Sequence, residues 1–280
     1  MIAPSEAAPS HGLRWFFGVA AVLAAIAGLE LFVAASDTDR FFSWTIEPPL
    51  TAAFMGAAYW AAMVLLGWAA RQRSWARART ALPAVFTIAV LLLIATAIHL
   101  DRFHHDLFGR FWELVYVIVV PLLAYLIWSQ VRGAGPVGRG DRPLPGWLRA
   151  VLGLQALVML ALGAALFVAP VGASSLWPWD LTPLTGRAVG AFLLGFGAAA
   201  AFAAADNDAG RLHGAALAYA TLGALELVAA VVHGGDFTSP ATGVAAYVVF
   251  CASVLALGLY GALVSSADSG LLRVPDTPRP

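Results

Sequence analysis

Long apolar stretches alternate with short polar connections along the whole chain. Eight of these stretches approach the roughly 20 residues that an α-helix needs to cross a bilayer core. They cover residues 14–35, 51–70, 81–100, 111–130, 149–170, 187–205, 213–233 and 243–265. Apolar and polar residues do not alternate within them, which argues against membrane-spanning β-strands. Backbone groups in lipid must pair within their own segment, so each stretch is predicted to be a transmembrane helix.

Composition supports this interpretation. Hydrophobic residues make up 61% of the 280 residues and charged residues only 11%, whereas soluble domains carry about 25% charged residues. The lipid bilayer is therefore the expected partner of the apolar surface. The formal net charge is zero, which gives no basic face for a nucleic acid. Cys251 is the single cysteine and lies in an apolar stretch, so we expect a small buried hydrophobe and no internal disulfide.

The first stretch has two features of a cleaved signal peptide, because Arg14 stands ahead of its apolar residues and the small residues Ala34 and Ala35 follow Val33. Its length exceeds the 7–15 residues of a signal core, and it has a counterpart later in the chain. We therefore interpret it as a retained helix.

Arginine, the only basic residue type apart from histidine, is distributed unevenly among the connections. The N-terminal flank, the even-numbered connections and the C-terminal tail carry twelve arginines, and the odd-numbered connections carry Arg40, Arg102, Arg110 and Arg187. The positive-inside rule then predicts that both termini are cytoplasmic. We expect a multi-pass protein of the cell membrane, specifically a bacterial inner membrane. Tryptophans near the stretch ends fit two interfaces, with Trp44, Trp112, Trp177 and Trp179 on the outer side.

The chain resembles itself at a fixed offset. At 134 residues, Pro49-Leu50-Thr51 matches Pro183-Leu184-Thr185, and His99 matches His233. At 135 residues, Trp44 matches Trp179. Such self-similarity indicates a duplicated unit. Four helices per unit predict two tandem repeats of the same orientation, related by a pseudo-two-fold axis along the membrane normal.

The predicted organisation has five parts. They are an N-terminal cytoplasmic tail (1–13), a first four-helix repeat (14–130), a Gly-, Pro- and Arg-rich cytoplasmic linker (131–148), a second repeat (149–265) and a cytoplasmic tail (266–280).

Ionisable residues within membrane helices are costly, and they mark functional sites or buried partners. Glu30 and Glu226 are the two that the sequence places at similar depth near the outer side. Tyr219 and His233 lie seven residues before and after Glu226, so they share its helix face. Glu30, His99, Tyr219, Glu226 and His233 are the candidate ligand-binding residues. The alternative is that each glutamate only joins two helices through a hydrogen bond, which the sequence favours.

Two further patterns have a structural and a functional interpretation. Residues 44–51 and 179–185 combine Trp, Pro and Thr, which favours ordinary helix starts over re-entrant segments. His99, His104, His105 and Asp106 are weak candidates for metal ligands, but their spacing matches no zinc signature. His99 and His233 as paired haem ligands are a third possibility, although nothing else marks a haem pocket. We therefore predict no cofactor and no metal.

No motif identifies a reaction or a characterised family. Residues 133–138 match G-x-G-x-x-G but follow a membrane helix and contain Pro136, which excludes a nucleotide-binding turn. A nucleophile elbow, a P-loop and a zincin helix are absent from the sequence, so the sequence leans away from an enzyme.

Three roles remain open. The sequence favours a non-catalytic scaffold or accessory membrane subunit, with other membrane subunits as partners. That role predicts that both glutamates are satisfied within the bundle, with no cavity beside them. The alternatives are binding or transport of a small-molecule ligand at an outer-facing site, and a membrane redox or haem protein that uses His99 and His233.

Overall fold

The computed structural model describes residues 7–104, 107–138 and 140–266, and all regular structure in these ranges is helical. Eight helices are long and apolar enough to cross a membrane, which confirms the prediction of an all-α, multi-pass architecture. They are α1 (His11–Val33), α3 (Pro49–Ala70), α5 (Leu82–Ile98), α6 (Leu107–Ala134), α7 (Gly146–Val168), α9 (Pro183–Asp206), α10 (Ala209–Val232) and α11 (Ala241–Ser266). The third span begins earlier than predicted, at Trp75, because α4 (Trp75–Ala78) and the 3-10 turn η1 (Arg79–Ala81) lead directly into α5.

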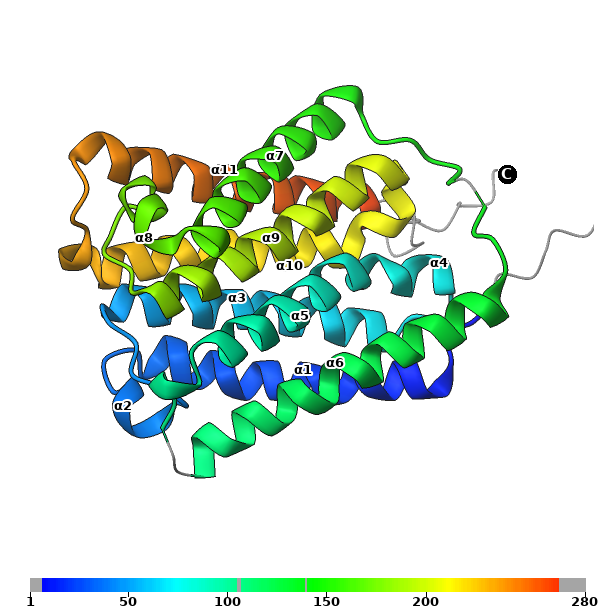
Figure 1. Ribbon diagram of the computed structural model, residues 1–280. Coiled ribbons are helices and arrows are strands. Elements are labelled where there is room, and N and C mark those ends of the chain that lie inside the picture. Colours follow the sequence, from blue (N-terminus) through cyan, green and yellow to red (C-terminus); the bar gives the residue numbers. More distant parts are fainter. Residues whose placement is uncertain (1–6, 105–106, 139, 267–280) are drawn as a thin grey trace, which may run out of the picture.

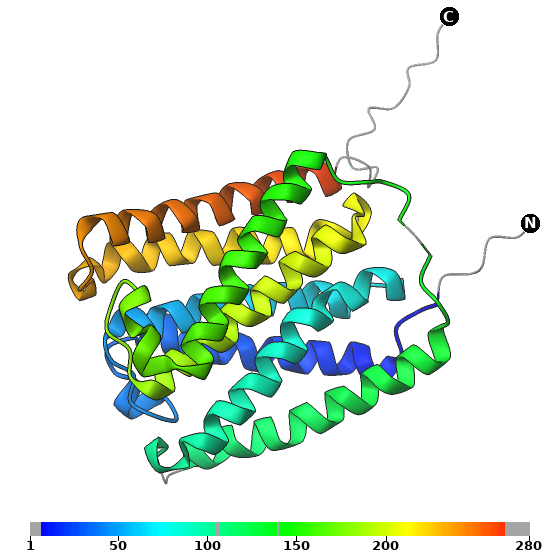
Figure 2. The same ribbon diagram turned by 45° about the horizontal axis from the view of Figure 1, so that its top comes forward.

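Short elements lie in the connections. They are α2 (Thr38–Phe41), α8 (Pro170–Ala173) and the 3-10 turns η2 (Leu100–Arg102), η3 (Ser174–Leu176) and η4 (Gly234–Asp236). The starts of α1, α4 and α7 lie at the same end of the bundle as the end of α11, and α2, α8 and the connection before α11 lie at the opposite end (Figures 1 and 2). We call these the Arg79 end and the Trp179 end.

The two Trp/Pro/Thr segments lead into regular helices. Pro49 and Pro183 occupy the first helical positions of α3 and α9, where a missing N–H costs nothing. Thr182 and Thr185 form a reciprocal capping box on α9. The backbone N–H of Leu50 in α3 is instead capped by Asp236 Oδ2 at 2.9 Å.

Helices α3 and α9 form the centre of the bundle. α3 packs against α1, α10 and α9, and α9 packs against α7, α5 and α3. α6 and α11 pack against α5 and α10, respectively, and lie further out (Figure 1). The central helices are accordingly the two most buried of the eight.

Glycines allow several of these helices to approach closely. A Cβ at Gly56 of α3 would lie 2.5 Å from the backbone nitrogen of Phe32 in α1, and one at Gly190 of α9 would lie 2.9 Å from that of Phe167 in α7. A Cβ at Gly258 of α11 would lie 2.2 Å from the backbone nitrogen of Ala220 in α10. Backbone contact at these places fixes how the helices cross.

The tryptophans at the Trp179 end do not face an interface, which corrects the expectation from the sequence. Trp44, Trp112, Trp177 and Trp179 are all at most 8% exposed. They belong to two aromatic clusters. In the first, Trp44 contacts Phe42, Phe103 and Trp112. In the second, Trp179 contacts Trp177, Phe237 and Tyr247. Aromatic rings in edge-to-face contact stabilise each other beyond the area they bury, and here they close the end of the bundle.

Ionic contacts join distant segments at the Arg79 end. Asp206, at the end of α9, pairs with Arg79 of η1 and with Arg211 of α10, whose Nη1 is 3.2 Å from Asp206 Oδ1. Arg211 Nη2 also donates to the backbone oxygen of Gly138, between α6 and α7. Asp206 therefore links three parts of the chain.

Candidate functional site

A cavity of about 500 Å³ lies between α7, α9, α10 and α11, close to the Trp179 end. We call it the Glu226 pocket. Its lining includes Phe54, Met159, Leu162, Trp177, Phe192, Glu226, Tyr247, Phe250 and Cys251. The volume falls in the range of small-molecule sites, which is about 300–1,000 Å³.

Glu226 lies six residues before the end of α10, and Tyr247 lies six residues after the start of the neighbouring α11. Because these helices are consecutive and antiparallel, the two side chains meet at the same depth, about 9 Å from the helix ends. The Tyr247 hydroxyl donates to Glu226 Oε2 at 2.8 Å. Glu226 Oε1 is buried and has no hydrogen-bond partner among the residues that the structure describes.

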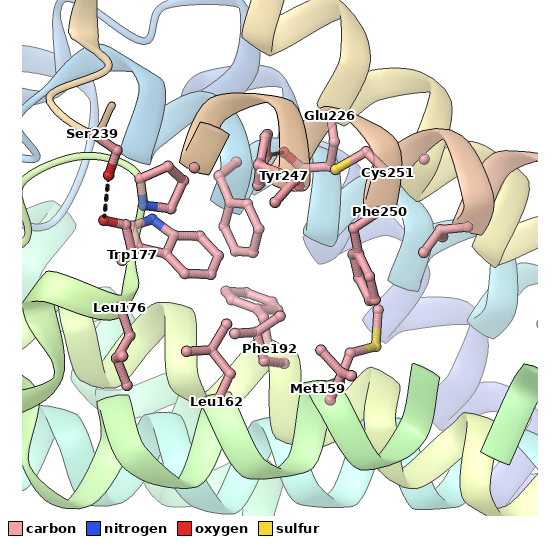
Figure 3. A pocket seen from close by; sticks show the side chains of 18 of the residues that line it. Met159, Leu162, Leu176, Trp177, Phe192, Glu226, Ser239, Tyr247, Phe250 and Cys251 are labelled. Carbon is pink, nitrogen blue, oxygen red and sulfur yellow. Dashed lines mark hydrogen bonds between the residues drawn. The ribbon is translucent and has the colours of Figure 1, made fainter. Parts of the chain in front are cut away.

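The rest of the pocket is apolar and strongly aromatic. Figure 3 shows Glu226, Tyr247 and Cys251 together on one side and Met159 and Leu162 on the other, with the rings of Trp177, Phe192 and Phe250 around the space between them. No arginine or histidine lines this cavity, so no cation of the described lining neutralises the carboxyl group.

The pocket is open to the outside of the bundle between α7 and α11. Val158 on α7 is 42% exposed and Leu176 is 62% exposed, although both line the cavity. Deeper along the same two helices, Gln155 donates to Ser253 at 2.9 Å and joins them. The opening therefore lies on the side of the bundle.

A second cavity of about 340 Å³ lies between α1, α3, α5 and α6. We call it the Glu30 pocket. Its lining includes Ala24, Ala27, Glu30, Phe42, Tyr59, Trp112, Tyr116 and Phe192. The Glu30 carboxyl group has no hydrogen bond or ion pair among the described residues, and the residue is partly exposed. Both glutamates that the sequence singled out thus border cavities.

Tyr219 lies two helical turns from Glu226, as the spacing predicts. It does not line the Glu226 pocket. It is buried below it, and its hydroxyl contacts Met159 Sδ at 3.5 Å. Since Met159 lines the pocket, Tyr219 supports its floor.

The two predicted histidines end their helices but border neither large cavity. His99 follows α5, and Arg187 of α9 donates to its Nε2 from 2.8 Å. Burial lowers the pKa of His99, and the neighbouring Arg187 cation lowers it further. His233 follows α10 in the same way. Neither the Glu226 pocket nor the Glu30 pocket therefore brings the two imidazoles together, and Nε2 of His99 already accepts from the Arg187 guanidinium.

The predicted metal candidates form no cluster in the described part of the chain. There, no three His, Cys, Asp or Glu residues are grouped so that they could hold a metal ion. Both ring nitrogens of His104 have protein partners, the backbone oxygen of Phe42 and the hydroxyl of Thr45. His105 and Asp106 lie outside the described residues.

Sequence reasoning missed Tyr247, Trp177 and Phe250. The sequence did contain a signal for Tyr247. It lies six residues after the start of α11, and Glu226 lies six residues before the end of α10, so two consecutive antiparallel helices place them side by side. The contribution of Trp177 had no such signal, because the path of the connection between α7 and α9 depends on tertiary packing.

Comparisons with known proteins add no assignment to this geometry. No protein-family model matches the chain, and neither a curated protein nor a solved structure gives a significant match. The site must therefore be interpreted from its own chemistry.

Proposed function

We propose that this chain is a membrane protein that binds a small amphiphilic amine in the Glu226 pocket, without performing chemistry on it. One observation carries the proposal: a buried carboxyl group with an unpartnered oxygen borders an apolar cavity large enough for a ligand. Buried polar atoms without partners are rare in native proteins and call for an explanation. A hydrogen-bond donor on a ligand supplies one.

The lining favours a cationic donor. A carboxylate attracts a protonated amine, and the faces of Trp, Tyr and Phe rings add cation–π attraction. The fold has already removed Glu226 from water, so the ligand gains the interaction without that cost. The terminal torsion of a glutamate is soft, so a small rotation presents Oε1 to the cavity. A phosphate-bearing lipid fits poorly because no arginine or histidine lines the pocket.

The scaffold role is the weaker proposal on its own criterion. It predicts glutamates that are satisfied within the bundle and have no cavity beside them. Only one oxygen of the Glu226 carboxyl group has a described hydrogen-bond partner, which is the Tyr247 hydroxyl. Both glutamates border cavities. The haem role has no support from the two pockets, because neither His99 nor His233 lines the Glu226 pocket or the Glu30 pocket.

We also propose the finer architecture. Residues 14–130 and 149–265 form two tandem repeats joined by a linker at 131–148. The helix contacts support this proposal, because exchanging α1, α3, α5 and α6 for α7, α9, α10 and α11 leaves the set of main contacts unchanged. The arginine distribution supports cytoplasmic tails at 1–13 and 266–280, in the cell membrane.

Photolabelling tests the ligand proposal directly. The protein, in nanodiscs of neutral lipid, is exposed to a long-chain alkyl amine that carries a diazirine, and labelled residues are located by mass spectrometry. We expect labels on α7 and α11 at the pocket, and at least tenfold weaker labelling there in Glu226→Gln, because a charge-assisted hydrogen bond contributes about 1.5–3 kcal/mol. Glu113→Gln on α6, which borders neither cavity, is the matched control.

The corresponding alkyl alcohol and alkyl carboxylate, with the same diazirine, distinguish the effect of the head-group charge from that of the alkyl chain. The amine is expected to label most strongly and the carboxylate least. Equal labelling by all three, or an unchanged pattern in Glu226→Gln, contradicts the proposal.

A further inference from the structure

The Glu30 pocket occupies, in the first four membrane helices, the place that the Glu226 pocket occupies in the last four. Many lining positions correspond at the offset of 134 or 135 residues. Among them are Ala24 and Met159, Ala27 and Leu162, Phe42 and Trp177, Tyr59 and Leu193, Ile88 and Leu222, and Tyr116 and Phe250. The two cavities are therefore related by the proposed repeat, although most of the paired side chains differ.

The carboxyl groups of the two pockets come from different helices. Glu226 is on α10, and the corresponding residue of α5 is Leu92. Glu30 is on α1, and the corresponding residue of α7 is Ala165. A carboxyl group thus borders each pocket, but the two glutamates do not occupy corresponding positions of the proposed repeat. A shared requirement for the same ligand chemistry explains why two unrelated positions acquired the same group.

The Glu30 pocket has its own polar features. The Glu30 carboxyl group has no hydrogen-bond or ion-pair partner among the described residues, and no arginine or histidine lines the cavity. The hydroxyls of Tyr59 and Tyr116, which both line it, are 2.9 Å apart. Only one of them can donate to the other, so one phenolic hydrogen stays available. Trp112 and Phe42 add aromatic faces.

The two pockets share one wall. Phe192 of α9 lines both cavities, is fully buried, and its ring lies 5.0 Å from that of Tyr59. The rim of the Glu30 pocket includes Ile26 on α1 and Phe111 on α6, which are 50% and 54% exposed. Each pocket thus opens to the outside of the bundle between the first and fourth membrane helices of its unit, and the shared wall separates them at the centre.

We infer that the Glu30 pocket is a second binding site for an amphiphilic amine, so that one chain holds two ligands, each beside its own glutamate. The inference takes its ligand class from the proposed function, but its site, its residues and its test are separate.

Native mass spectrometry of the protein with a long-chain alkyl amine counts the bound ligands. We expect two in the unchanged protein, one in Glu226→Gln, one in Glu30→Gln and none in the double variant, with two retained in the Glu113→Gln control. Photolabelling by the diazirine amine should locate the ligand that survives in Glu226→Gln on α1 and α6. The alkyl alcohol should bind at least tenfold more weakly at both sites.

Filling variants provide a test that leaves the carboxyl groups in place. Ala27→Leu introduces into the Glu30 pocket the residue found at the corresponding position of α7, and Ala246→Trp introduces into the Glu226 pocket the counterpart of Trp112. Each is expected to remove one ligand from its own pocket only.

The outcomes separate the two proposals. A single ligand that Glu226→Gln removes and Glu30→Gln leaves in place overturns the second site and keeps the proposed function. A ligand lost only in Glu30→Gln overturns the proposed function and keeps the Glu30 site. Absence of bound amine in the unchanged protein overturns both.

Discussion

The Tyr247 hydroxyl on α11 donates a 2.8 Å hydrogen bond to Glu226 Oε2 on α10, and it is the one described partner of that carboxyl group. The two antiparallel neighbours place these side chains at one depth, beside the Glu226 pocket. The pair both joins the helices and holds the carboxyl group at the pocket wall.

Tyr247→Phe should reveal what this bond contributes. The variant leaves both oxygens of a buried carboxyl group without a described partner, which is expected to lower the free energy of unfolding by about 1–3 kcal/mol. Denaturation in detergent micelles, followed by circular dichroism, measures the change. Tyr260→Phe is the control, because the Tyr260 ring packs on Trp147 and its hydroxyl has no hydrogen bond within the described part of the chain. An equal effect in both variants would show that the Glu226 bond contributes nothing specific.

The crossing of α10 and α11 depends on glycine. A Cβ at Gly258 would lie 2.2 Å from the backbone nitrogen of Ala220, so Gly258→Ala must push the helices apart. We expect a loss of about 1–3 kcal/mol, as for other overpacked sites. Gly153→Ala on α7 is matched, because a Cβ there meets nothing within 4 Å, and it should stabilise slightly through helix propensity. Thermal unfolding compares the two, and a Gly258→Ala variant as stable as Gly153→Ala would contradict the close crossing.

The contact between His99 and Arg187 predicts a pH dependence. The hydrogen bond from Arg187 to Nε2 requires a neutral ring. Burial lowers the folded-state pKa of His99 below its usual 6.5, and the Arg187 cation lowers it further. Asp101 raises this pKa, and Arg102 makes a smaller contribution that lowers it. The unfolded chain therefore binds the proton first as the pH falls. Stability from this contact is fully present above about pH 6.5 and is lost as the pH falls through the folded-state pKa. Thermal unfolding between pH 5 and 8 should show this loss in the unchanged protein and a smaller one in His99→Gln; identical pH profiles would refute it.

Asp206 holds the Arg79 end together, and Asp206→Asn should loosen it. The change removes the charge that pairs with both Arg79 and Arg211, which leaves two mostly buried cations with weaker partners. We expect a loss of about 1.5–3 kcal/mol, the range for hydrogen bonds to charged groups. Asp141→Asn, at an exposed position between α6 and α7, is the control. Equal stability of the two variants would show that the ion pairs are not important for folding.

The fold was largely predictable because lipid imposes a simple rule. Backbone groups must pair within each apolar stretch, so length and hydrophobicity suffice to locate all eight spans, and Pro49 and Pro183 mark two of the starts. The burial of Trp44 and Trp179 was not predictable. A tryptophan near a helix end fits an interface or a closed cluster equally well, and only the folding of the connections over the bundle decides between them.

The site was predictable in part for the same reason. The cost of a carboxyl group in lipid drew attention to Glu30 and Glu226, and both border cavities. His99 and His233 stood out because they match at the offset of 134 residues, and such a match says nothing about a cavity. The cavities themselves depend on how α7 and α11, or α1 and α6, diverge, and that is a matter of packing between distant segments.

If the eight helices span a bilayer, successive connections must lie on its opposite sides, and cysteine labelling in intact cells measures this most directly. In a Cys251→Ser background, single cysteines replace the exposed residues Arg73, Asp101, Asp141 and Thr238. A membrane-impermeant maleimide is expected to label the cysteines at 101 and 238 from outside, and those at 73 and 141 only after the membrane is opened. Labelling of positions 73 and 101 from the same side would contradict the eight-span topology and, with it, both pockets as sites reached from the membrane.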